Sequence, residues 1–498
     1  MMTTSWRLAF SLVLAGSGLA FQLGCSGGGD GGSGGGGMGA GGVATPGDVY
    51  EFPSRFDAGR SAVSHTGQTL RHVLIEDLER YVGALTEAVD GGGTPPQTQA
   101  EVVAALQFFY DFDGATGGVE LHGVTTTPAP LQAVYDDISS GKSLREKMAG
   151  NDDSTDHADW DGGAFVGWSD PDIAAHGGSL DSPEGLLLAM FNTLGRYVEQ
   201  RLQAGPAMEP GTTMPIPQVY VTTTGIDLQQ LIQKFLLMGV AYSQGADDYL
   251  DDDVDGKGLS SPNTQEEGEP YTVLGHHFDE GFGYFGAARD YLAYSDEEIA
   301  AEGGRSDWQG HHDSDGDGAI DLAREHNWGA SVNAAKRDLG AGGSTDYTTQ
   351  AMRSFIDGRA LILAAGESLT ADELSTLRVH AETAVAAWEN AIVATVVHYI
   401  NDTIADTEAI DADPAAYVFV DHAKHWSEMK GFALGLQFNP RSKIAGADFA
   451  ELHGLMGDQP VLATATPMER AAYVTSLQMA RDLIGQRYGF TAAQLEGW

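Results

Sequence analysis

The chain of 498 residues contains a single cysteine, Cys25, and few basic side chains. One cysteine excludes an intramolecular disulfide and any cysteine-rich zinc or iron–sulfur site. With 27 Lys and Arg against 71 Asp and Glu, the formal net charge is −44 at pH 7. Nucleic acid is therefore excluded as a partner, because its phosphate backbone repels such a chain. Any metal chemistry must use histidine and carboxylate ligands.

Long hydrophobic runs are also scarce, and the main one lies near the N-terminus. It extends from Leu8 to about Phe21, follows Arg7, and is too short for a comfortable membrane span. This pattern is typical of a signal peptide. Cys25 stands directly after Leu-Gly, where a lipoprotein cleavage site places the residue that receives lipid. We predict a lipoprotein signal peptide over residues 1–25 with lipidation at Cys25; an ordinary secretory signal is the alternative.

The next segment, residues 26–47, is rich in glycine and serine. Such a composition cannot bury a core and favours a flexible tether. A lipidated cysteine followed by a tether predicts a domain anchored by lipid in the bacterial cell envelope. We expect it at the outer membrane, on either the periplasmic or the surface side.

From Tyr50 onward, apolar residues recur at spacings of three and four, which is typical of helices. Strand-type alternation is nearly absent outside residues 218–224. The expected helices lie at about 70–85, 102–109, 183–198, 226–243, 271–292, 346–364, 371–404, 414–437 and 466–487. The sequence therefore predicts an all-α domain over residues 48–498. We expect two related, packed helical bundles, roughly 48–265 and 266–498.

Two of these helices repeat a pattern of His, aromatic, Glu, Gly and aromatic. His277 and Glu280 in one helix align with His425 and Glu428 in the other. Residues three apart on a helix project from one face, so each pair can contact one ion. We predict that the pairs face each other across the bundle junction and share a zinc or iron ion, with His276 as an alternative ligand. The alternative is that they are structural core residues, each bonded to a carbonyl or to its partner.

An acidic segment beginning at Asp313 resembles an EF-hand calcium loop. Carboxylates occupy its first, third, fifth and ninth places, Gly318 the sixth, and an isoleucine the eighth. The twelfth place is Arg324, which cannot bind a cation, and a glutamate follows one residue later. The predicted calcium ligands are Asp313, Asp315, Asp317, Ala319, Asp321 and Glu325. A solvated acidic turn is the alternative, and a helix is expected to begin near Leu322.

Other polar residues receive simpler interpretations. The run from Asp251 to Gly256 imitates the first half of a calcium loop and then stops, so we interpret it as a solvated loop. Trp388, on the longest helix, is interpreted as core. Glu389 and His398, on the same helix, are candidates to support the predicted His/Glu site from behind its ligands.

The pattern Gly275-x-His277-x-x-Glu280 resembles the signature of imelysin-like proteins. These are bacterial envelope proteins built from two helical bundles and proposed to be metallopeptidases or metal-binding uptake proteins. Longer segments are similar to a family of bacterial lipoproteins of unknown function related to imelysin, and this resemblance covers residues from about 48 to 498. They are Gly67-Gln68-Thr69-x-Arg71, His276-His277-x-Asp279-Glu280-x-Phe282-Gly283-Tyr284, Ala334-Ala335-Lys336-Arg337-Asp338 and His425-Trp426-x-Glu428-x-Lys430-Gly431-Phe432.

The sequence thus favours an envelope lipoprotein with a metal-binding ectodomain, acting in metal capture or uptake. A metal-dependent hydrolase of peptidase type is the runner-up, with Glu280 or Glu428 as base. The chain lacks the two-histidine zincin pattern and the Gly-x-Ser-x-Gly nucleophile turn. A third interpretation is a passive surface protein that binds a polymer or a protein partner; it predicts no intact His/Glu site.

Overall fold

The computed structural model describes residues 47–498, apart from 92–93, 153–156, 169 and 177–179. The predicted signal peptide, Cys25 and nearly all of the tether lie outside the described residues. Within the described chain, Tyr50 is already fully buried. Its hydroxyl donates a hydrogen bond of 2.8 Å to Asp279 Oδ1, which fastens the start of the domain to its interior.

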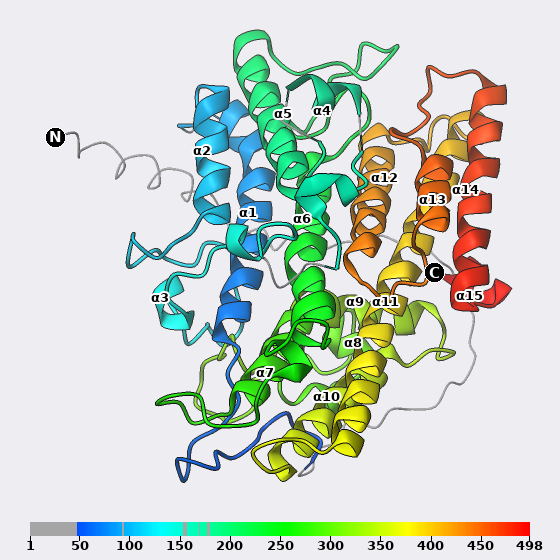
Figure 1. The fold of residues 1–498 in the computed structure, drawn as a ribbon. Helices are drawn as coiled ribbons and strands as arrows, with labels where there is room; N and C mark the ends of the chain where they lie inside the picture. Colours follow the sequence, from blue (N-terminus) through cyan, green and yellow to red (C-terminus); the bar gives the residue numbers. More distant parts are fainter. Residues whose placement is uncertain (1–46, 92–93, 153–156, 169, 177–179) are drawn as a thin grey trace.

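The described residues form helices and no β-strand, which confirms the all-α prediction (Figure 1). Residues 218–224 contribute only an isolated bridge, Val221 to Asp227. The longer helices are α1 (Thr66–Asp90), α2 (Gln99–Tyr110), α5 (Pro183–Ala204), α6 (Leu228–Leu236), α7 (Val273–Phe285), α9 (Gly329–Gly340), α10 (Tyr347–Ala364), α11 (Ala371–Ala412), α12 (Phe419–Leu434), α13 (Ala447–Met456) and α14 (Pro467–Tyr488). No helix in the described ranges is both long and apolar enough to cross a bilayer.

Shorter elements connect them. The short α-helices are α3 (Tyr135–Ile138), α4 (Pro171–His176), α8 (Asp296–Ile299) and α15 (Ala492–Gly497). The 3-10 segments are η1 (Arg145–Lys147), η5 (Gly258–Ser260), η6 (Tyr291–Ala293) and η7 (Gly435–Phe438). The π-helical segments are η2 (Trp160–Ala164), η3 (Leu237–Tyr242) and η4 (Gly245–Tyr249).

Helix starts follow from local chemistry. Ser182 accepts a hydrogen bond from Gly185 N, and Pro183 occupies the first turn of α5, where its missing N–H costs nothing. Thr370 and Glu373 form a reciprocal capping box at the start of α11. These caps satisfy first-turn N–H groups that have no partner within the helix.

The helices pack around one continuous hydrophobic core. In Figure 1, α1, α2, α5 and α6 lie together on one side, α12, α13 and α14 on the other, and α7 to α10 at one end. The long helix α11 packs against α10 and also against α12 and α14. Because α6 packs on α12 and α1 packs on α7, the core crosses the boundary expected near residue 265. The division into two half-bundles at that point stays a prediction.

A close approach places η4 against α11. A Cβ atom on Gly245 would lie 2.6 Å from Cζ3 of Trp388, so only glycine fits at the first residue of η4. Trp388 is buried, as the sequence predicts. The π-helical turn then directs the acidic residues that follow Gly245 into the interior.

Candidate metal sites

The histidines and the glutamate of α7 lie in a polar cluster beside α1 and η5. His277 Nδ1 lies 2.7 Å from Ser261 Oγ, and Glu280 Oε1 accepts a 2.8 Å hydrogen bond from Gln68 Nε2. His276 Nδ1 lies 3.0 Å from a carboxylate oxygen of Glu266, and its Nε2 lies 4.0 Å from Glu280 Oε1. Burial lowers the pKa of His277, although the charge of Glu280 partly opposes this. The ring is therefore available as a neutral ligand.

The corresponding residues of α12 have partners on α11 and α6. His425 Nδ1 lies 2.8 Å from Asp406 Oδ2, and Glu428 Oε1 lies 3.4 Å from Lys234 Nζ. Burial lowers the pKa of His425, but the hydrogen bond to Asp406 and the charges of Asp406 and Asp402 outweigh it, so the pKa is raised. His425 is therefore held by carboxylates rather than left free for a shared ion.

The two motif helices repeat one packing arrangement. A Cβ on Gly283 of α7 would lie 2.9 Å from Cβ of Gln68, and a Cβ on Gly431 of α12 would lie 2.8 Å from Cβ of Lys234. Gln68 and Lys234 are also the side chains that contact Glu280 and Glu428. Each motif glycine thus lets its helix approach a different neighbour, α1 or α6. The repeat in the sequence corresponds to two equivalent helix pairs.

This arrangement does not bring His277 and Glu280 together with His425 and Glu428. In the part of the chain that the structure describes, two groups of three or more possible ligands have atoms within 4.8 Å of one another, and neither contains a motif residue. The prediction of one shared ion is corrected here, because each motif packs on its own partner helix. Zinc or iron at one motif alone, with His276 included in α7, stays a prediction.

The two supporting residues predicted on α11 have different surroundings. His398 Nε2 lies 3.4 Å from Asp402 Oδ2, and that oxygen lies 3.9 Å from His425 Nε2, so the two histidines share a carboxylate neighbour. The buried Glu389 accepts hydrogen bonds of 2.5 Å from the hydroxyls of Tyr242 and Tyr488. Glu389 belongs to this separate network.

The first three acidic residues of the predicted calcium loop do converge. Ligand atoms of Asp313, Asp315 and Asp317 lie within 4.8 Å of one another. Asp313 Oδ1 accepts a 2.7 Å hydrogen bond from Gly316 N, and its Oδ2 accepts one of 3.0 Å from Gly318 N. Ala319 N donates to Asp317 Oδ1 over 2.9 Å. The loop is therefore wound around its own carboxylates.

Two of the later predicted ligands, Asp321 and Glu325, hold the loop in place through hydrogen bonds and act as its braces. The buried Glu325 accepts hydrogen bonds from Ser314 N and Asp321 N, both of 2.8 Å, and so joins the two ends of the loop. Asp321 Oδ1 accepts a 2.9 Å hydrogen bond from Gln132 Nε2. The helix expected near Leu322 is not formed: a turn follows the loop, and α9 begins only at Gly329. Glu325, which a helix would carry forward, instead folds back onto the loop.

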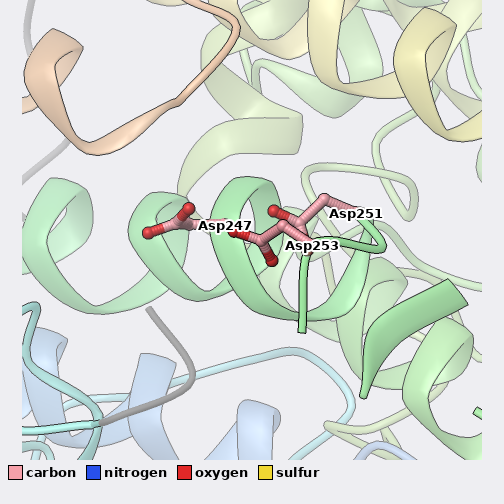
Figure 2. A group of neighbouring side chains, drawn as sticks. All are labelled: Asp247, Asp251 and Asp253. Carbon is pink, nitrogen blue, oxygen red and sulfur yellow. The ribbon is translucent and has the colours of Figure 1, made fainter. Parts of the chain in front are cut away.

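A second acidic group lies at the end of η4, and the sequence interpretation missed it (Figure 2). It consists of Asp247, Asp251 and Asp253. Asp251 is only 8% exposed and Asp247 is fully buried, so the interpretation of a solvated loop from residue 251 is wrong at its first residue. The available signal was the four-residue spacing of Asp247 and Asp251 directly after an apolar helical stripe, which places both on one face.

Comparison with known proteins finds a match for only one part of this all-α chain. A family model described as a domain of unknown function (DUF4856) matches residues 198–312. The matched segment contains α6, α7, the acidic group of Figure 2 and the chain up to the start of the Asp313 loop. No curated protein and no solved structure matches the chain. Nothing in these comparisons connects it with imelysin-like proteins.

Proposed function

We propose that this protein is an envelope-anchored lipoprotein whose helical domain binds calcium in the Asp313 loop and takes part in metal capture or uptake. The observation that carries the proposal is the convergence of Asp313, Asp315 and Asp317 within 4.8 Å in a loop braced from outside. Carboxylates are ligands that calcium prefers, and their mutual repulsion is relieved when a cation lies between them.

The braces make the loop a preorganised site. Ile320, at the eighth place, is fully buried, and its backbone pairs with the 129–131 segment through hydrogen bonds of 2.8 and 3.0 Å. Glu325 joins the loop ends, and Gln132 holds Asp321. Because the backbone is already fixed, calcium binding does not have to order a flexible segment, and less conformational entropy is lost.

The proposed location rests on the N-terminal sequence. The signal peptide pattern, Cys25 and the glycine-rich tether together favour a lipid anchor. The burial of Tyr50 supports a globular domain that begins directly after the tether. A tethered domain of net charge −44 would also gather cations around itself, which suits capture at a membrane surface.

The test is thermal unfolding of the purified full-length protein with calcium and with chelator. A ligand that binds only the folded state stabilises it by about 2.7 kcal/mol at 100 times its Kd, so Tm should rise by several degrees with calcium. Asp315→Asn with Asp317→Asn should abolish this rise, because two of the three converging carboxylates become amides.

The matched control is Asp255→Asn with Glu267→Gln, which removes two charges from exposed positions outside the loop. The control should keep the calcium-dependent shift. If the unaltered protein melts at the same temperature with calcium and with chelator, or if the control loses the shift as fully as the loop variant, calcium binding by this loop is refuted.

A further inference from the structure

We propose that Asp247, Asp251 and Asp253, together with His157, form a second metal site for a divalent ion of the Mn²⁺ or Fe²⁺ class. This site extends the proposed function and does not rest on the calcium loop. Ligand atoms of the three aspartates lie within 4.8 Å of one another, and Figure 2 shows them around the end of η4.

The buried carboxylates of this group are poorly compensated by the described residues. Asp251 is 8% exposed, and its Oδ2 has no partner other than the neighbouring carboxylate of Asp253; Asp247 is 0% exposed and is contacted by His157. Buried polar groups are nearly always paired, and a bare buried carboxylate needs a cation, a donor or a proton. A buried Asp251 oxygen with only another carboxylate beside it, next to the fully buried Asp247, is the observation that points to a ligand.

His157 adds a nitrogen at the edge of the group. Its Nδ1 lies 2.7 Å from Asp247 Oδ2, so without a metal the two groups form an ion pair or a hydrogen bond. The contact places an imidazole nitrogen and a carboxylate oxygen side by side at the edge of the group. An ion bound there would take both atoms as ligands, since neutral imidazole and carboxylate both bind first-row divalent metals.

The nearby cationic side chains have other partners. Arg441 lies near enough to lower the pKa of Asp251, but its guanidinium donates to the carbonyls of Leu250 and Ala246. Arg378 pairs with the neighbouring Asp252 at the surface. No ion pair of the described residues therefore joins a Lys or Arg to Asp247, Asp251 or Asp253.

The donor set of this site differs from that of the calcium loop. Three carboxylates with one imidazole suit Mn²⁺ or Fe²⁺ better than the all-oxygen set of the Asp313 loop, which suits calcium.

The experiment is a Mn²⁺ titration of the full-length protein by electron paramagnetic resonance, with saturating calcium present to occupy the Asp313 loop. We expect one bound Mn²⁺ per chain. Asp247→Asn and Asp251→Asn should each weaken binding at least tenfold. Asp253 is exposed, so Asp253→Asn keeps the fold and should also weaken binding. His157→Ala should remove the ¹⁴N coupling from the Mn²⁺ spectrum.

Asp252→Asn is the matched control, because it removes the same charge from the same acidic run but from a carboxylate that faces Arg378. It should bind Mn²⁺ like the parent. Absence of Mn²⁺ binding, or equal binding by the parent, Asp247→Asn and Asp253→Asn, would overturn the site. The Asp315→Asn/Asp317→Asn variant should keep Mn²⁺ binding, so failure of either site is seen separately.

Discussion

The buried ion pair of Asp279 and Arg359 should dominate the stability of the α7–α10 contact. Asp279, within the α7 motif, is 0% exposed, and the Arg359 side chain is 2% exposed. Arg359 Nε donates to Asp279 Oδ1 over 2.8 Å, and Tyr50 donates to the same oxygen over the same distance. Asp279→Ala leaves the guanidinium buried with a single carbonyl partner, Ala62 O at 3.1 Å.

The expected cost of Asp279→Ala is about 3–5 kcal/mol, the usual penalty for an uncompensated buried charge. Arg359→Met should cost less, because the two partners are not equivalent. An aspartate left alone can take up a proton, and burial already raises the pKa of Asp279, whereas an arginine cannot lose its proton. The free energy of unfolding, measured from urea denaturation followed by circular dichroism at 222 nm, gives both values.

The decisive variant combines Asp279→Leu with Arg359→Met. Replacing both charges by apolar groups of similar volume removes the unpaired charge, so the double variant should be more stable than Asp279→Leu alone. If the cost of the double change equals the sum of the two single costs, the pair is not energetically coupled, and the reasoning from burial is refuted.

Two further predictions concern other parts of the chain. Burial lowers the pKa of His65 to about 3, so between pH 6.5 and 3 the unfolded chain binds the proton that the folded protein excludes. Stability is therefore complete well above pH 6.5 and is lost as the pH falls. In His65→Leu the slope of unfolding free energy against pH, measured by urea denaturation from pH 7 to 5, should be flatter by about 1 kcal/mol per pH unit on average, and an unchanged slope would contradict this. Cys25→Ala should leave the protein unlabelled by a radioactive fatty acid and either soluble or unprocessed, because each buried CH₂ of an acyl chain contributes about 0.8 kcal/mol to membrane binding; normal processing with full membrane retention would contradict the lipid anchor.

Periodicity predicted the helices well because it reports which face of a segment is apolar. The expected 346–364 and 466–487 lie within a residue of α10 and α14. Helices α9 and α13 were missed: both are short, and α9 buries polar residues such as Asp338, which accepts hydrogen bonds from the first-turn N–H groups of Tyr347 and Thr348. A buried polar contact of that kind leaves no apolar pattern.

The sites were harder to predict, because a ligand set depends on which helices become neighbours. Spacing within one segment was enough to bring Asp313, Asp315 and Asp317 together. It was not enough for His277 and His425, whose positions depend on the packing of α7 on α1 and of α12 on α6. Local spacing predicts local sites, while a site shared between helices requires the tertiary contacts.

Helix α11 is one long, continuous helix that contacts several other helices of the domain. Its 42 residues contain neither glycine nor proline, so at a rise of 1.5 Å per residue it extends about 60 Å without an inbuilt kink. Its contacts with α10, α12 and α14 fasten two regions of the molecule to one rigid rod. Closure of two lobes about a hinge would have to bend this rod, so we expect an ion that binds the proposed acidic sites to enter by movement of side chains and loops.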